Sequence, residues 1–292
     1  MKHTISNDKL VFVSDSYQVE PWELCFKDDG VNYFWRPESA EKLGAAVCFP
    51  LLGFLQENRY VLNGKEYTMD IHGFAKECDF AVVYKSDSGI VYELTDSEWT
   101  RKQYPYRFRF QVAYILEGAS LRTEYRVKNL GDGEMHFSVG GHPRYACPVD
   151  GGRFEDCYVE FEKPERIENV IKTYGSLSVI EKYLSKDGRR ISLDYSLFEK
   201  GCFCLHPVNS TFVTLKSAGT KRSLRLESDD TLTHLQFWTS VGGQFLCMEP
   251  WYGSITHLPP KETDGDWKAR PGTLCIKPGA ESVHAYDVTV SK

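Results

Sequence analysis

The chain has 292 residues, 14 % of them aromatic, and its 35 lysine and arginine residues against 41 aspartate and glutamate residues give a net charge of −6. A nucleic-acid partner would favour a basic surface, so this charge balance argues against nucleic-acid binding. No run of residues approaches the roughly 20 apolar positions of a membrane span, which argues against a membrane partner. Aromatic residues suit the half-buried surface of a β-sheet, and the length allows a large core.

Nine cysteines are scattered along the chain without the short Cys or His pairs that announce a zinc site, at positions 25, 48, 78, 147, 157, 202, 204, 247 and 275. We therefore expect no bound metal, and we expect no cofactor because nucleotide-binding glycine motifs are missing too. The odd number of thiols and a start, MKHTISNDKL, without the apolar stretch of a signal peptide favour the reducing cytoplasm. We expect a monomer or a weak homodimer.

Short β-prone runs follow one another from end to end of the chain, the first at residues 10–14, 22–26 and 32–35. The run 106–116 alternates clearly, with Tyr106, Phe108 and Phe110 on one face and arginines on the other. Further strands are predicted at residues 121–127, 135–139, 158–161, 211–216, 224–227, 235–239, 245–248 and 282–290.

Helical signals are few: residues 196–200 suit a single turn, and residues 165–182 have a mixed character. No Gly/Ser-rich or Pro-rich linker divides the chain, and the polar stretch 257–272 is typical of a surface loop before the closing strands. The sequence therefore predicts an all-β fold, with one antiparallel, sandwich-like domain that spans residues 1–292.

Four polar residues stand where strands are expected to meet loops, a common place for binding and catalytic groups: Arg59, His72, His142 and Glu249. Each also has a structural explanation. A histidine beside Gly or Pro often only bonds the backbone, and Arg59 is of a type that pairs with acids at the surface. Glu249 follows the apolar run 245–248, where a buried carboxylate needs a partner such as an arginine.

Together these residues suit one class of reaction, the opening and closing of a cyclic hemiacetal. A base takes the proton from the anomeric hydroxyl and an acid protonates the ring oxygen, after which the aldehyde rotates and closes with the roles reversed. A carboxylate and an imidazole can both act near neutral pH. The reaction needs neither a metal nor a nicotinamide.

The order of several short motifs resembles the aldose 1-epimerase (galactose mutarotase) family, and most closely its short branch associated with lactose operons (LacX-like proteins). The motifs run along nearly the whole chain: Phe49-Pro50, Asn58-Arg59, His72-Gly73-Phe74-Ala75, Tyr104-Pro105-Tyr106, Val127-Lys128-Asn129, Gly140-Gly141-His142-Pro143, Phe237-Trp238-Thr239, Glu249-Pro250-Trp251 and Lys277-Pro278-Gly279. The resemblance implies a galactose-mutarotase-like supersandwich of antiparallel sheets with few short helices. It implies an isomerase that interconverts the α and β anomers of a free hexose.

The resemblance also implies a role for each matching residue. Glu249 would be the general base, His142 the general acid, and His72 a hydrogen-bonding group near the reacting centre. Arg59, with Asn58 beside it, would bind sugar hydroxyls, and Trp251 would supply an apolar wall. The family places a further Asp in its sugar cleft; at the aligned position this chain has Gly201, with Asp194 and Glu199 nearby.

Two other functions stay open. An epimerase of a phosphorylated hexose would need convergent cations, for which the candidates are Arg36, Arg101, Arg107, Arg109 and Arg144, the last near the expected mouth of the cleft. A non-catalytic sugar-binding or sensing module would need hydroxyl-binding groups without a matched acid and base. For the enzyme we expect His72, His142 and Glu249 to line one cleft bordered by Arg59 and Trp251. The Glu249 carboxylate and the His142 imidazole should then lie about 5–8 Å apart, each reaching its own substrate oxygen.

Overall fold

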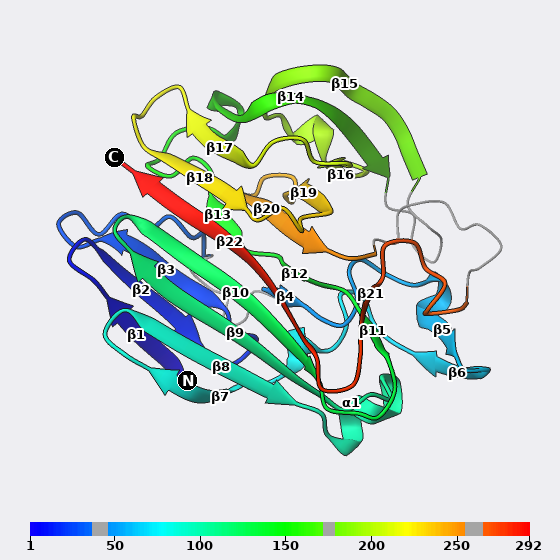
Figure 1. The fold of residues 1–292 in the computed structure, drawn as a ribbon. Coiled ribbons are helices and arrows are strands. Elements are labelled where there is room, and N and C mark those ends of the chain that lie inside the picture. The colour runs from blue at the N-terminus through cyan, green and yellow to red at the C-terminus, as the bar shows by residue number, and fades with distance from the viewer. Residues whose placement is uncertain (37–45, 172–178, 255–264) are drawn as a thin grey trace.

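The computed structural model describes residues 1–36, 46–171, 179–254 and 265–292. Antiparallel strands dominate it (Figure 1), as the sequence predicts. The first three strands form a sheet of their own, made of β1 (Lys2–Ser6), β2 (Leu10–Asp15) and β3 (Pro21–Phe26). Residues 32–35, predicted as a strand, instead make two isolated bridges through Asn32 and Phe34, because each pairs for one residue only.

One large sheet holds most of the other strands and carries the candidate site. Its order is β4 (Val47–Cys48), β12 (Val139–Gly141), β20 (Phe245–Tyr252), β19 (His234–Trp238), β16 (Gly201–Leu205), β14 (Cys157–Ile171), β17 (Phe212–Ser217), β18 (Ser223–Ser228), β22 (Glu281–Ser291), β10 (Ser120–Asn129), β9 (Phe108–Glu117), β8 (Gly89–Thr95) and β7 (Ala81–Lys85). In addition, β13 (Arg144–Ala146) pairs with β20, and β15 (Val179–Ser192) pairs with β14. Of the stretch of mixed character, 165–182, the described residues 165–171 and 179–182 lie in these two paired strands.

Small pairs and short helices complete the fold. The pairs are β5 (Arg59–Leu62) with β6 (Lys65–Thr68), and β11 (Met135–Phe137) with β21 (Leu274–Ile276). In the described residues the helices are α1 (Glu98–Gln103) and four 3₁₀ turns, η1 (Gln56–Asn58), η2 (Ala75–Glu77), η3 (Phe154–Asp156) and η4 (Tyr195–Leu197), the last close to the predicted turn. A reciprocal capping box between Ser97 and Thr100 starts α1. The predicted loop 257–272 lies partly outside the described residues.

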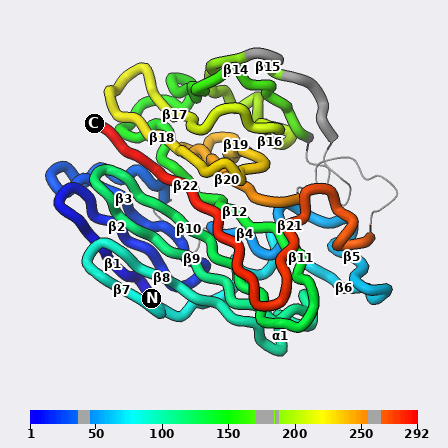
Figure 2. The backbone as a smooth tube through the Cα atoms, viewed as in Figure 1, coloured from blue at the N-terminus to red at the C-terminus, as the bar shows by residue number. Residues whose placement is uncertain are grey.

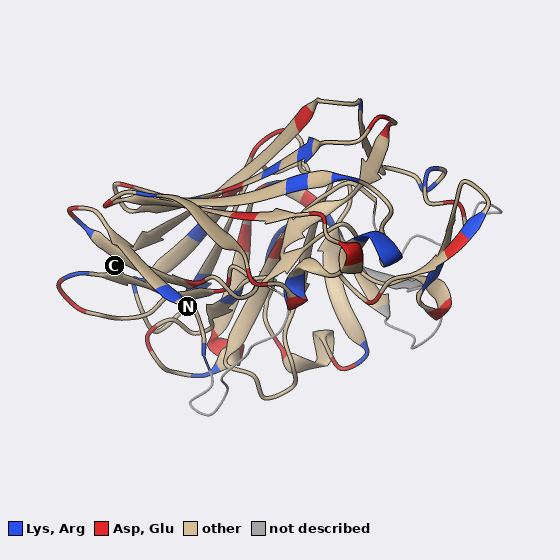
Figure 3. Ribbon diagram, turned by 90° about the horizontal axis from the view of Figure 1, so that it is seen from below, with Lys and Arg blue, Asp and Glu red and all other residues tan. Residues whose placement is uncertain are grey.

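The core forms where alternating side chains of the sheet face inward. Along β9, Phe108, Phe110 and Val112 are fully buried while Arg109 and Gln111 are partly exposed, which confirms the predicted alternation. Lysine, arginine, aspartate and glutamate residues are interspersed over the ribbon (Figure 3). Among the described residues, the search for a helix of bilayer-spanning length and apolarity finds none.

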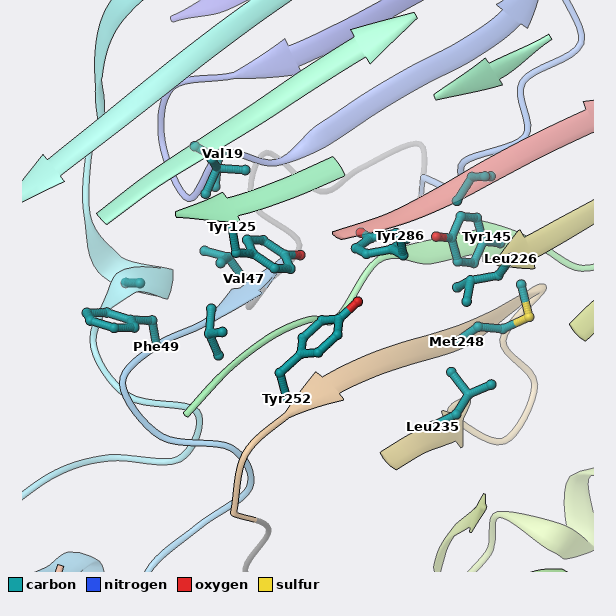
Figure 4. Packing of buried hydrophobic residues seen from close by; sticks show 14 of the residues in the cluster. Val19, Val47, Phe49, Tyr125, Tyr145, Leu226, Leu235, Met248, Tyr252 and Tyr286 are labelled. Atoms are coloured by element: carbon teal, nitrogen blue, oxygen red, sulfur yellow. The ribbon is translucent and has the colours of Figure 1, made fainter. Parts of the chain in front are cut away.

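Strand β20 is buried on both faces, and this positions the candidate site. Leu246, Met248 and Tyr252 belong to the main core, and Figure 4 shows Met248 and Tyr252 pointing into it. The alternate residues, including Glu249 and Trp251, must point to the opposite side of the sheet. We call that side the site face. The backbone trace places β20 between β12 and β19 in the middle of the molecule (Figure 2).

Candidate active site

His142 and Glu249 lie directly opposite each other on two neighbouring segments of the sheet. Gly140 pairs with Trp251 on one side of them and Arg144 pairs with Cys247 on the other, in the same register. His142 Nε2 lies 3.5 Å from Glu249 Oε1. The acid and base inferred from sequence are therefore brought together on the site face.

The expected separation of 5–8 Å between these two groups is wrong. It assumed that the two residues come from neighbouring strand ends and straddle a single sugar ring. Because they are cross-strand neighbours, their Cβ atoms are only about 5 Å apart and their side chains meet directly. Glu249 is 0 % exposed, and its other oxygen, Oε2, accepts a hydrogen bond of 3.2 Å from the Gln236 side-chain amide. Gln236, which was not singled out from the sequence, therefore orients the carboxylate.

His72 reaches the same place from a turn and not from a strand. Its backbone has a left-handed φ of 64°, and its N–H donates to the Gly53 carbonyl over 2.7 Å. The imidazole ring lies 5.2 Å from that of His142. Since the Gly53 N–H donates to His72 Nδ1 over 3.1 Å, the neutral ring carries its proton on Nε2. His72 is thereby prepared to donate a hydrogen bond.

Gly73, which follows His72, also has a left-handed φ, of 72°. A Cβ at this position would lie 2.3 Å from the Phe49 carbonyl oxygen, so only glycine fits. The turn is fixed to Phe49 by backbone hydrogen bonds in both directions, from Phe49 N to the His72 carbonyl and from Phe74 N to the Phe49 carbonyl. Such strained backbone is common at functional sites. The motif His72-Gly73-Phe74 thus forms a rigid turn that holds the His72 imidazole in a fixed position.

Trp251, for which the resemblance implied the role of an apolar wall, is closed to solvent in the structure. It is 1 % exposed and its indole N–H donates to the Gly141 carbonyl over 3.2 Å. Its ring packs against the His72 ring, with the two centroids 5.8 Å apart, and so supports that imidazole. The partly exposed Trp238, whose ring lies 6.0 Å from His142, offers an aromatic face instead.

Arg59 and Asn58 lie at the exposed end of η1 and the start of β5. The Arg59 guanidinium pairs with Glu57 and lies 3.7 Å from Glu66, which is the ion-pairing alternative weighed for this residue. Asn58 has a left-handed φ of 56°, and its carbonyl accepts from Met69 N. Their part in sugar binding stays a prediction.

Arg144 follows His142 by two residues and pairs with Cys247 across the strands β13 and β20. Its guanidinium carbon lies 5.7 Å from the centre of the Phe245 ring. Its charge acts on Glu20: burial raises the pKa of Glu20 to about 7, and Arg144 and Arg36 oppose the rise. Arg144 thus lies near enough to the N-terminal part of the chain for its charge to act on Glu20.

The other cations considered for a phosphate are dispersed. Arg101 of α1 pairs with Asp96, and Arg109 of β9 pairs with Glu281.

The residues considered for the missing Asp lie at the start of β16 and in the segment just before it. Gly201 pairs with Ile171 at the start of β16. The Asp194 carboxylate caps η4 by accepting from the Ser196 N–H, and hydrogen bonding to the Ser196 side chain together with this backbone bond lowers the pKa of Asp194. Glu199 is exposed.

Cys247 adds a thiol to the acid–base pair. Donor atoms of His142, Cys247 and Glu249 lie within 4.8 Å of one another, and a mixed N, S and O set of this kind suits Zn²⁺. We expect EDTA alone to leave the rate of the enzyme unchanged, and added Zn²⁺ to inhibit it by occupying both acid and base. Cys247→Ser should weaken the inhibition, which a titration of rate against Zn²⁺ measures.

The control for this prediction is a second His–Cys cluster, Glu134, His136 and Cys275. Cys275→Ser should leave the inhibition unchanged. Loss of activity in EDTA, regained on adding a metal, would contradict the expectation that the chemistry needs no metal.

Comparison with known proteins places this site in a family. Residues 53–286 match the family model described as aldose 1-epimerase, and the chain belongs to that family. It is 28 % identical over 274 residues to Protein LacX of Lactococcus lactis subsp. lactis, with 90 % of each chain covered.

Two solved structures extend the similarity to the whole fold. A galactose mutarotase related enzyme from Lactobacillus acidophilus superposes with a TM-score of 0.88 at 26 % identity, with 100 % of this chain and 98 % of that one covered. A galactose mutarotase-like protein from Lactobacillus casei gives a TM-score of 0.89 at 24 % identity, with both chains fully covered. The resemblance and the fold inferred from the motifs are confirmed. These relationships support an isomerase-type carbohydrate epimerase.

Proposed function

We propose that the protein is an aldose 1-epimerase that interconverts the α and β anomers of a free hexose by general acid–base catalysis. One observation carries the proposal: His142 Nε2 and Glu249 Oε1 meet at 3.5 Å on one face of the sheet, with the His72 ring beside them. The acid and the base act on two oxygens that are attached to the same carbon of the sugar. The two side chains must therefore lie close to each other, as those of His142 and Glu249 do.

In this mechanism Glu249 removes the proton from the anomeric hydroxyl while His142 protonates the ring oxygen, which opens the ring. Rotation about the bond between C1 and C2 presents the other face of the aldehyde. Closure follows with the roles reversed, because protonated Glu249 returns its proton to the carbonyl oxygen and neutral His142 accepts one from the attacking hydroxyl. Gln236 keeps the carboxylate in position, and the Nε2–H of His72 donates to a sugar oxygen near the reacting centre.

Polarimetry tests the proposal directly. Freshly dissolved α-glucose or α-galactose should reach its equilibrium rotation faster in proportion to the amount of protein added. A sugar-binding module would bind the same sugars in calorimetry and leave the polarimeter trace unchanged, and that result would overturn the enzymatic proposal.

Replacing His72 by Asn should lower kcat/KM for mutarotation by about tenfold or more, less than replacing an acid or base, because His72 positions and polarises without transferring a proton. The measurement is polarimetry over a range of sugar concentrations. His3→Asn is a control, since His3 belongs to β1 of the N-terminal sheet, where its ring packs against Tyr92 of β8. A loss for His72→Asn larger than that for His142→Asn would exchange the two proposed roles.

A further inference from the structure

One row of side chains crosses the site face from the acid–base pair to a second carboxylate. We call it the site row, and it consists of His142, Glu249, Gln236, Cys204 and Glu168. Each member lies directly opposite the next: Glu249 pairs with Gln236, Gln236 with Cys204, and Cys204 with Glu168. Paired residues of antiparallel strands project to the same side. Glu168 therefore lies on the site face, three strand spacings or about 14 Å from Glu249 measured between Cα atoms.

The packing confirms which side these residues occupy. Val170, Cys202 and Cys204 form a small buried cluster with Trp238 packed against it, separate from the main core. Their neighbours along the same strands, including Ile167, Phe203 and Phe237, belong to the main core on the other side. Burial raises the pKa of the Cys204 thiol well above its usual range, so Cys204 stays neutral. The middle of the site row, formed by Gln236 and Cys204, is thus uncharged.

Glu168 lies at the end of the site row that is farthest from His142, and its two carboxylate oxygens have different surroundings. The residue is 2 % exposed, and its Oε1 lies 3.1 Å from the Arg166 guanidinium. Its Oε2 is buried without a hydrogen-bond partner among the residues that the structure describes. Burial raises the pKa of Glu168, and the charge of Arg166 followed by that of His206 opposes the rise. A buried carboxylate oxygen without a partner costs stability, which a ligand hydroxyl would restore.

We propose that Glu168 binds sugar hydroxyls remote from the anomeric carbon and so determines which sugar the site accepts. This inference rests on the proposed function. A pyranose that reaches Glu249 with its anomeric hydroxyl extends along the site row over Gln236 and Cys204. Its distant hydroxyls then meet the Glu168 carboxylate, and Trp238 offers an aromatic face to its C–H groups. Arg166 holds the carboxylate through Oε1 and leaves Oε2 for the sugar.

The same arrangement favours a free sugar over a phosphorylated one. A carboxylate accepts hydrogen bonds from hydroxyls but repels a phosphate dianion, and a phosphate would need two or three convergent cations. At this end of the site row Arg166 is already engaged by Glu168. Glu168 thereby distinguishes an epimerase of a free hexose from the alternative that acts on a phosphorylated hexose.

The first experiment measures KM and kcat separately for Glu168→Gln and Glu168→Asp. We expect KM for α-glucose or α-galactose to rise by about 10-fold to 100-fold, the scale of one lost hydrogen bond to a charged group, with kcat changed much less. Glu160→Gln is the matched control on the same strand, because Glu160 pairs with Lys216 at the other end of β14. Thermal unfolding verifies that each variant is folded, and the Asp variant serves if Gln prevents folding.

The second experiment identifies the hydroxyl with 2-deoxy-, 4-deoxy- and 6-deoxygalactose. A purely structural Glu168 would lower affinity for all sugars alike. A sugar-binding Glu168 predicts that one deoxy sugar is a poor substrate for the wild type and suffers no further loss in Glu168→Gln. Equal losses for every deoxy sugar would overturn the proposal, as would a wild type that prefers hexose 6-phosphate to the free hexose.

The outcomes separate this inference from the function on which it rests. Rapid mutarotation with a Glu168→Gln variant equal to the wild type would refute the inference and leave the function intact. If the wild type binds sugar in calorimetry without accelerating mutarotation, and Glu168→Gln weakens that binding, the function fails while the inference holds.

Discussion

Replacing Glu249 by Gln should lower the rate of mutarotation by about two to four orders of magnitude, the usual scale for a lost general acid–base group. Gln has nearly the same shape, so the strand should keep its place between β12 and β19. The amide can still contact Gln236 and His142 but has no lone pair basic enough to take a proton. Polarimetry on the purified variant, with thermal unfolding alongside, measures the effect.

The matched control for Glu249→Gln is Glu124→Gln. Glu124 is a mostly buried carboxylate that pairs with Arg122 and Arg126 on β10, which six other strands separate from β20 in the sheet order. Its replacement should change stability and leave kcat unchanged. A folded Glu249→Gln variant with near-wild-type kcat would exclude Glu249 as the base.

Replacing His142 by Asn should cause a loss of similar size, because it removes the group that protonates the ring oxygen. The variant should also change the pH profile. If His142 supplies the acid, the alkaline limb of kcat/KM in the wild type reports its titration in the free enzyme, and that limb should disappear in His142→Asn. Rates measured by polarimetry at closely spaced pH values give both results.

His284→Asn is the control for this second prediction. His284 is also buried, but its two ring nitrogens bond Thr231 and Ser282 over 2.8 Å and 2.9 Å, and burial lowers its pKa. Its loss should affect stability alone. Should His284→Asn abolish the alkaline limb and His142→Asn retain it, the acid has been assigned to the wrong histidine.

The fold was predictable because its signals are local. Alternation along 106–116 specifies a strand whatever it pairs with, and the structure has β9 there. The hairpin β14–β15 was harder to predict, since four register shifts interrupt its pairing and break the period of two. That stretch contains Glu168, which explains why sequence reasoning passed over it.

The candidate site was predictable only in part, for a related reason. Motifs single out His72, His142 and Glu249, and the structure brings them together. Which residues stand beside them depends on register between distant strands, which no local pattern reveals. Gln236 and Trp238 enter the site through the pairing of β19 with β20. The same register turns Trp251 into a buried support, although the resemblance implied an apolar wall.

The two short strands on either side of His142 have one more consequence. Both β12 and β13 pair with β20 in a single register, while His142 itself donates its N–H to the Ala46 carbonyl and Pro143 has none to give. His142 therefore lies in a break between two short strands that keep one register. The number of residues in this break determines which face of the sheet its side chain points to. Deleting or inserting one residue there would turn the histidine to the opposite face of the sheet. The pairing of His142 with Glu249 therefore cannot adapt gradually to a change in the number of residues between β12 and β13, because each single-residue change separates the acid from the base.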